Sequence, residues 1–200
     1  AMTLRAAEPT QRSLDAVSAA LSELAGRSEF RRRALARVNP LDVALAVPHD
    51  VYTLGLDEVA DRAGIEQARQ IGRRFLVMAG NRTVSSAAIA DEDGTGFQAN
   101  EGPYVVATAE AIARAEDDPD LAKGDYEIRL LRIPALYFVA LWLRDERGHD
   151  DVLVPLDPAP EPFEPGRNYG PDEVLTELAA SARTRLEFDD VEGSSSHSAD

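Results

Sequence analysis

The sequence predicts an α+β fold built on an antiparallel sheet of about five or six strands. Segments with strand character are grouped and joined by turn signals, whereas βαβ proteins alternate strands with helices. Helical periodicity is confined to an N-terminal hairpin, one inserted helix and a C-terminal helix. With 200 residues the chain is long enough for one hydrophobic core. We therefore expect an α+β domain over 2–155, a proline-rich arm with a C-terminal helix over 156–188, and a disordered acidic, serine-containing tail over 189–200.

The N-terminal region predicts a helical hairpin or one kinked helix. Four apolar residues recur at the spacing of one helical face: Leu14, Val17, Leu21 and Leu24. Gly26 is a stop signal for this first helix. A second periodic segment from Glu29 to Val38 ends before Pro40, because the residue that precedes a proline avoids α geometry.

Strand candidates follow in the middle of the chain. The apolar run 43–47 is interpreted as a short strand or as the start of another helix, and 48–50 as a turn that interrupts it. Residues 75–79 and 82–89 flank a Gly-Asn pair. Because both of these residues tolerate positive φ, the segment predicts a β-hairpin.

The second half of the domain predicts one helix and three strands. An amphipathic segment that starts at Pro103 and ends before Pro119 predicts the inserted helix, because proline suits the first helical position. The alternating residues 125–133 predict a half-buried strand, and further strands are expected over 135–144 and 152–154.

The C-terminal quarter changes character. Six of the 12 prolines fall between Pro155 and Pro171, which predicts an extended arm. A helix from Pro171 to Phe188 follows, and acidic residues in its first turn suit the helix dipole. This helix either folds back on its own domain or reaches a neighbouring subunit. Folding back is favoured because it buries the apolar stripe on the nearest surface.

Charge is distributed unevenly along the chain, whose formal net charge is −15. Residues 145–200 hold 15 acidic and four basic residues, so −11 of this charge lies there. Nucleic acids and anionic lipids need a cationic surface, so we expect neither as a partner. The apolar run 133–143 is too short to cross a membrane, and a cytoplasmic protein is expected. The absence of cysteine excludes disulfides, thiolate metal sites and cysteine nucleophiles.

One loop resembles two binding motifs without completing either. Residues 94–99 match the spacing of a relaxed dinucleotide fingerprint, but the expected helix starts several residues too late for its amides to face a pyrophosphate. Asp91 and Asp93 begin a calcium-loop pattern, but Gly102 stands where that loop needs glutamate. A turn is the favoured interpretation, a weak cation site remains the alternative, and no cofactor is expected.

Histidine is scarce, and no complete catalytic motif is present. His49, His149 and His197 are the three histidines. The first two each precede aspartate, an arrangement that suits general-base or metal chemistry, but polar turns explain both more simply. The chain has no G-x-S-x-G elbow, P-loop, H-E-x-x-H or kinase set. The sequence therefore favours a protein that is not an enzyme, without deciding the matter.

Two groups of residues are candidates for recognition. The first is a basic patch that would contact a partner: Arg27, Arg31, Arg32, Arg33 and Arg37. It is either a solvated helix face or a docking surface for an acidic partner or for the chain's own 187–192 segment. The second group would line a pocket between the sheet and the helices: Tyr126, Arg129, Tyr137 and His149.

These observations favour a non-catalytic, cytoplasmic accessory or regulatory protein that acts through charge-segregated surfaces. The expected partner is another protein or a second copy of this chain. An acidic antagonist of a basic protein is one specific version, and acidic residues on a single face of 145–190 would support it. The alternative is a small-molecule-binding protein or an enzyme with a pocket between sheet and helices.

Overall fold

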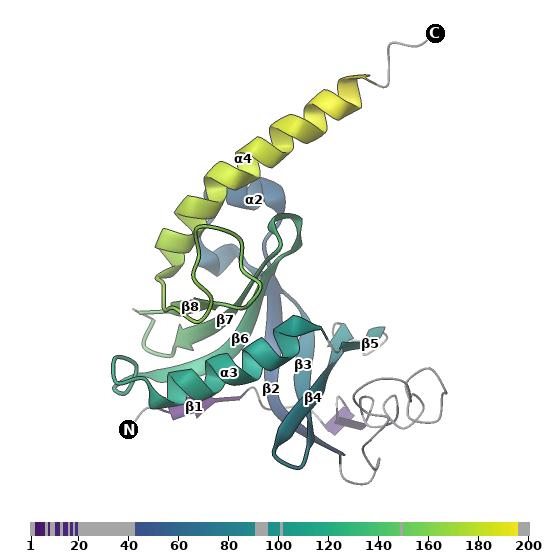
Figure 1. The fold of residues 1–200 in the computed structure, drawn as a ribbon, viewed down its shortest axis with the longest axis vertical. Coiled ribbons are helices and arrows are strands. Elements are labelled where there is room, and N and C mark those ends of the chain that lie inside the picture. The colour runs from purple at the N-terminus through teal and green to yellow at the C-terminus, as the bar shows by residue number, and fades with distance from the viewer. Residues whose placement is uncertain are drawn as a thin grey trace.

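A mixed sheet of eight strands, curled into a half-barrel, forms the centre of the fold (Figure 1). The computed structural model describes residues 3–6, 8, 11, 12, 14, 15, 17, 19, 43–90, 96–100, 102–148 and 150–195. The strands are β1 (Thr3–Arg5), β2 (Val43–Thr53), β3 (Arg69–Ala79), β4 (Arg82–Ala90), β5 (Gly96–Asn100), β6 (Asp125–Ile133), β7 (Phe138–Asp145) and β8 (Val152–Pro155).

The prediction of an antiparallel sheet with five or six strands is wrong. The strand order is β5-β4-β3-β2-β6-β7-β8, and β2 runs parallel to β6 along Arg129–Arg132. The N-terminal strand β1 also runs parallel to β6, along Asp125–Glu127 on the same edge. Parallel neighbours are joined by long connections rather than by tight turns, so local turn signals do not reveal them. The sequence therefore showed the hairpins and missed the pairings that join the two halves of the sheet.

The predicted N-terminal helical hairpin is also wrong for the part of the chain that the structure describes. The described residues between 11 and 19 are helical, and no helical hairpin is present among them. Residues 20–42, which hold the expected second helix, lie outside the described residues. The helices and 3-10 turns are α2 (Leu56–Ala60), η4 (Ile65–Gln67), α3 (Pro103–Asp117), η5 (Pro134–Leu136) and α4 (Pro171–Ser195). None of these helices is long and apolar enough to cross a membrane.

Strand β2 continues through the segment that the sequence interpretation assigned to a turn. Its register against β3 shifts between Ala46 and His49, which forms a bulge. Pro48 cannot donate a hydrogen bond to a neighbouring strand, and Val47 has a φ of 47°. The bulge therefore accommodates the proline while the strand runs on to Thr53.

Two hydrophobic cores cover the two faces of the sheet. Successive residues of β6 point to opposite faces, so Ile128 and Leu130 join the core under α3, whereas Leu131 and Ile133 join the core under α4. Helix α3 begins at Pro103 as predicted. Helices α2 and α4 pack together over the second core (Figure 1).

The proline-rich arm lies against the domain. Phe163 is buried between Phe138 and Tyr169, with edge-to-face ring contacts at 5.2 and 5.6 Å between centroids. The Tyr104 hydroxyl donates to the Pro158 carbonyl at 3.2 Å, which ties the arm to α3. These contacts bring the chain back to the sheet before α4 begins.

Helix α4 folds back on its own domain and then projects from it. Its buried side chains lie between Val174 and Ala182, and the Nε–H of Arg183 donates to the Ala60 carbonyl of α2 at 3.2 Å. The helix continues to Ser195, beyond the expected end at 188, and extends away from the body (Figure 1). The boundaries proposed for the domain, the arm and the tail stay a prediction.

Candidate functional site

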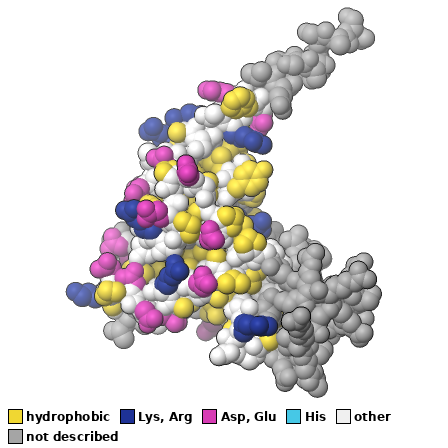
Figure 2. Space-filling view, viewed as in Figure 1, with side chains coloured by type: hydrophobic (Ala, Val, Ile, Leu, Met, Phe, Trp, Pro, Cys, Tyr) yellow, Lys and Arg dark blue, Asp and Glu magenta, His cyan; other side chains and the backbone are white. Residues whose placement is uncertain are grey.

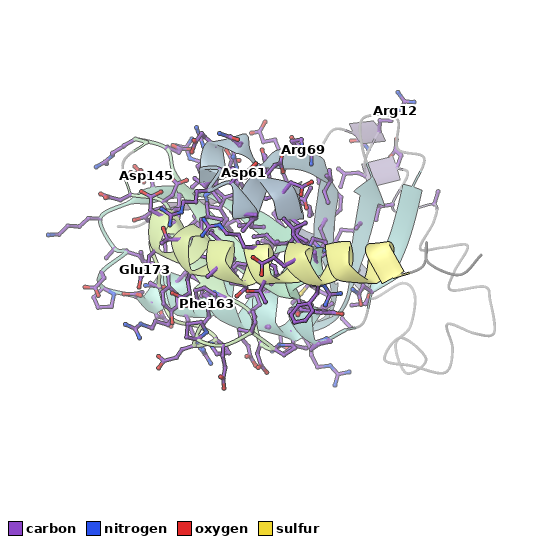
Figure 3. The ribbon with its side chains drawn as sticks, turned by 90° about the horizontal axis from the view of Figure 1, so that it is seen from above. Arg12, Asp61, Arg69, Asp145, Phe163 and Glu173 are labelled. Atoms are coloured by element: carbon purple, nitrogen blue, oxygen red, sulfur yellow. The ribbon has the colours of Figure 1, made fainter. Side chains whose placement is uncertain are left out.

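An open cavity of about 610 Å³ lies on the α4 side of the sheet. Its lining comes from β2, β6 and β7, from the turn between β7 and β8, from the segment around η4 and from the start of α4. Figure 3 shows Asp145 at the same end of the molecule as the first turn of α4, where Glu173 is labelled. Segments that are far apart in the sequence therefore meet at this site.

A stacked arginine forms the floor of the cavity. Arg129 and Trp142 are direct neighbours on β6 and β7, and Tyr52 comes from β2 on the other side of β6. The guanidinium carbon of Arg129 lies 4.6 Å from the centroid of the Tyr52 ring and 4.8 Å from that of Trp142. Its Nε–H donates to Glu127 Oε1 at 2.6 Å. Aromatic faces attract cations, so the two rings and the Glu127 carboxylate together hold this guanidinium in place.

Two aspartates shape the turn that forms one wall. Asp151 accepts hydrogen bonds from the Trp142 indole N–H and from the Asp145 backbone N–H, both at 2.8 Å. Asp145 accepts from the backbone N–H groups of Arg147 at 2.9 Å and Asp150 at 3.3 Å. Short carboxylate side chains commonly bond to the backbone of a turn in this way. The turn is therefore held to strand β7 by the hydrogen bond between Trp142 and Asp151, and Asp150 lies at the rim of the cavity.

The lining carries more negative than positive charge. Its carboxylates are Glu66, Asp145, Asp150, Asp151 and Asp172, and its cations are Arg129 and Arg144. The side chains of Glu66, Asp150 and Asp172 are exposed at the rim. Within the described part of the chain, none of these three carboxylates has an ion-pair or hydrogen-bond partner. We call these three residues the acidic rim.

Two tyrosines have a raised pKa, Tyr52 in the cavity lining and Tyr126 on the opposite face of the sheet. Burial raises the pKa of Tyr52, the neighbouring Arg129 opposes this, and Asp50 adds to it. Burial also raises the pKa of Tyr126, and the negative charge of Asp145 is the next cause. Both hydroxyls therefore stay protonated at neutral pH.

Only one of the four predicted pocket residues is shown to line this cavity. Arg129 lies at its floor, whereas Tyr126 is buried in the core on the α3 side of the sheet. Tyr137 follows η5 with a φ of 52° and is 74% exposed, outside the cavity lining. His149 lies outside the described residues, and the glycine and aspartate on either side of it both line the cavity.

Sequence reasoning missed Tyr52, Trp142 and the acidic rim. Trp142 belongs to a segment that was expected only to form a strand, and it is 3% exposed. It belongs to the α4 core and also lines the cavity. Residues 138, 140, 142 and 144 alternate on one face of β7, and this spacing was the available signal. The candidate partner surface Arg27, Arg31, Arg32, Arg33 and Arg37 lies outside the described residues.

A second polar cluster is buried on the opposite face of the sheet. The Nε–H of Arg74 donates to His49 Nε2 at 2.8 Å, and its Nη2 donates to the Thr108 hydroxyl. Because Nε2 of His49 accepts, its Nδ1–H donates to the Val47 carbonyl at 2.6 Å. Burial and the Arg74 charge lower the pKa of His49 to about 3. This neutral, fully buried imidazole joins β2, β3 and α3 and has no access to solvent.

The loop that resembled two binding motifs is described only in part. Residues 91–95 lie outside the described residues, and Gly96 begins strand β5 rather than a helix. The described residues contain no group of three or more acidic or histidine side chains placed to hold a metal ion. The cavity with its acidic rim is therefore the candidate site.

Comparison of the chain with family models, with curated proteins and with solved structures finds no significant match. The cavity is consequently the feature of the described residues that bears on function. Its acidic rim is suited to binding a positively charged group.

Proposed function

We propose that this protein is a non-catalytic binding module that docks a basic partner protein on the acidic rim of the cavity. The convergence of Glu66, Asp150 and Asp172 carries the proposal. They come from three segments that are far apart in the sequence, and within the described part of the chain none of the three carboxylates has an ion-pair partner. Three exposed carboxylates on one cavity would attract a basic group of a partner.

The charge of the whole chain supports the same kind of partner. A net charge of −15 attracts basic proteins over a distance and raises their rate of encounter. Acidic and basic side chains are interspersed over the face that carries α3 and α4 (Figure 2). On that face the charge does not form one continuous acidic surface, so the cavity is the better candidate for specific recognition.

The biological role in this proposal is that of a cytoplasmic accessory or regulatory protein. A module of this kind acts by occupying a basic surface of its partner, which either blocks that surface or recruits the partner. The exposed, unpaired rim suits such a role, because exposed charges chiefly set partner choice and association rate.

A small-molecule-binding protein or an enzyme is the second candidate, and the cavity volume favours it. Ligand sites commonly enclose about 300–1,000 Å³, and this cavity of about 610 Å³ falls within that range. A small ligand would have to bind without any macromolecular partner. Protection from thermal unfolding by a low-molecular-weight cation would therefore distinguish this candidate from the first.

The proposal is tested by binding of a short unstructured peptide rich in arginine and lysine to the full chain at low ionic strength. We expect the variant Glu66→Gln/Asp150→Asn/Asp172→Asn to bind at least about tenfold more weakly, because three charges nearest the peptide are lost. The matched control is Glu161→Gln/Glu173→Gln/Glu177→Gln, which removes the same charge from exposed positions outside the cavity lining.

Retained affinity in the control would support docking at the rim. Equal weakening in both variants would mean that only net charge matters, and unchanged affinity in the rim variant would contradict the proposal directly.

A further inference from the structure

We propose that the projecting half of α4 pairs antiparallel with the same helix of a second copy of this chain. The contact uses one exposed face of the helix, which carries Ala180, Thr184 and Phe188 and which we call the α4 ridge. This inference is independent of the cavity and of the partner proposed for it. It follows from what α4 leaves exposed where it extends beyond the body (Figure 1).

The first half of α4 packs on the domain, and the second half leaves it. The buried side chains of the helix end at Ala182, Leu186 is half-buried, and the side chains of 187–189 are all exposed. Phe188 is 66% exposed, although its ring would gain from burial. One exposed ring alone is ordinary on a protein surface, so its neighbours on the helix decide whether it belongs to an interface.

The neighbours of Phe188 on this face are small. Ala180, Thr184 and Phe188 follow one another at intervals of four residues, which places them in one row along the helix. The Thr184 hydroxyl donates to the Ala180 carbonyl at 3.1 Å, so its polar group is satisfied within the helix and its methyl group is left for packing. The α4 ridge therefore has a bulky ring at one end and a shallow apolar surface at the other.

Charged residues flank the ridge in the same order on both sides. Arg183 and Glu187 form the row on one side, and Arg185 and Asp189 form the row on the other. Arg185 and Asp189 are 55% and 58% exposed, and their closest approach within the helix is only 4.0 Å. Within the described residues Glu187 has no ion-pair partner. Each row thus has a basic residue followed by an acidic residue that can bind a charge on another chain.

An antiparallel pair matches these features with themselves. If the two helices cross at Leu186, Phe188 of each copy lies opposite Thr184 of the other, so each ring covers a shallow surface. On each side of the ridge, an arginine then lies within two residues, or about 3 Å along the axis, of an acidic residue of the second copy. A parallel pair would instead bring arginine beside arginine and carboxylate beside carboxylate. Charge complementarity therefore selects a second copy in the antiparallel direction.

The pairing is weak and reversible. The ridge spans about two to three turns, and so short a contact buries less than the roughly 1,200–2,000 Å² of stable interfaces. The net charge of −15 also makes two copies repel at long range. At about 0.15 M salt the Debye length is about 8 Å, so this repulsion is screened while contacts between adjacent side chains persist.

Sedimentation equilibrium of the full chain from about 10 µM to 1 mM in about 0.15 M salt tests the proposal. We expect a monomer–dimer equilibrium within this range, as for a transient interface. Phe188→Ala should weaken association at least about tenfold, because it removes the ring at the centre of the contact. The matched control is Val106→Ala, which truncates a side chain of α3 that is 52% exposed, and it should leave association unchanged.

A charge exchange tests the direction of the pair. Arg185→Glu and Asp189→Arg each place like charges opposite one another on one side of the ridge, so each variant alone should associate at least about tenfold more weakly than the wild type. An equimolar mixture of the two restores both opposite pairs, and we expect it to associate about as tightly as the wild type. Both positions are exposed, and thermal unfolding followed by circular dichroism checks that each variant remains folded.

Three results would overturn the proposal. A wild-type chain that stays monomeric at 1 mM would leave this face to a different protein. Dimers that Phe188→Ala does not weaken, or that Val106→Ala weakens equally, would place the interface elsewhere. A mixture of Arg185→Glu and Asp189→Arg that associates no better than either alone would exclude the antiparallel pair. None of these results bears on binding of a basic partner at the cavity.

Discussion

His49 and Arg74 form a buried hydrogen-bonded pair, and burial lowers the pKa of both side chains. The sequence offered His49 next to aspartate as a possible general base. The structure instead gives it two hydrogen bonds, to Val47 and Arg74, that fix it as a neutral acceptor at Nε2. Burial and the positive charge of Arg132 lower the pKa of Arg74 to about 10, so this group remains charged at neutral pH. These residues therefore serve stability.

The first prediction concerns the pH dependence of this pair. The pKa of His49 is about 3 in the folded protein and 6.5 in the unfolded chain, so the unfolded chain takes up a proton first as the pH falls. The contribution of His49 to the free energy of unfolding is therefore fully favourable above pH 6.5 and is lost as the pH falls toward 3. The slope is at most about 1.4 kcal/mol per pH unit for one proton.

The measurement compares the free energy of unfolding of the wild type and His49→Gln between pH 6.5 and pH 4.5. We expect a shallower pH dependence in the variant, because glutamine keeps an acceptor for Arg74 and takes up no proton. Parallel curves for the two proteins would show that His49 is not held neutral.

A second prediction for a single residue concerns Gly166 in the arm. Its φ is +81°, and a Cβ there would lie 2.3 Å from Arg114 Nη1. We expect Gly166→Ala to lower the free energy of unfolding by about 1–2 kcal/mol, because a side chain is strained in the left-handed region. Gly170→Ala is the control, since nothing lies within 4 Å of a Cβ there and its φ is outside that region. Chemical denaturation that finds equal losses would refute this explanation.

At the level of elements, local sequence signals predicted where individual helices and strands lie better than they predicted which strands pair. The strand 125–133, the helix that begins at Pro103 and the hairpin around Gly80 are present as expected. The parallel pairing of β2 with β6 was not predictable, because no local pattern records which distant strand lies alongside. The bulge at Pro48 was mistaken for a turn, since proline signals both.

The candidate site was predicted only in part for the same reason. Arg129 was recognised as a polar residue on a half-buried strand. Its ring partners Tyr52 and Trp142 come from strands on either side of it, and only the sheet order brings them together. The acidic rim likewise joins three segments whose proximity depends on the packing of α4 and the arm.

The arm is a structural element, and Phe163 is its anchor. It is buried against Phe138 and Tyr169 at the edge of the α4 core. We expect Phe163→Ala to lower the free energy of unfolding by about 3–5 kcal/mol, as deletion of a buried aromatic side chain usually does. Glu161→Ala, on an exposed side chain of the same arm, should change it by less than about 0.5 kcal/mol. An equal and small effect of both changes in urea unfolding would mean that the arm is not packed as described.

For the whole molecule, the sequence places most of the excess negative charge in the C-terminal quarter. It does not show how these acidic residues are arranged in the folded protein. Residues 145–200 carry a net charge of −11, and two of the three rim residues, Asp150 and Asp172, lie in this part of the chain. Glu66 comes from the first half, so the site is not a property of the acidic segment alone. The half-barrel and the returning arm create one cavity from both parts.

We propose that the acidic rim of the cavity receives a basic partner, and one nuclear magnetic resonance titration tests this proposal. The single tryptophan gives one indole N–H signal, from the group that donates to Asp151 at the cavity. Titration of the ¹⁵N-labelled full chain with the short basic peptide should shift this signal and the amides of Asp150 and Asp151 to saturation. A glutamate-rich peptide should leave them in place. An indole signal that stays fixed while amides elsewhere respond to the basic peptide would contradict the claim.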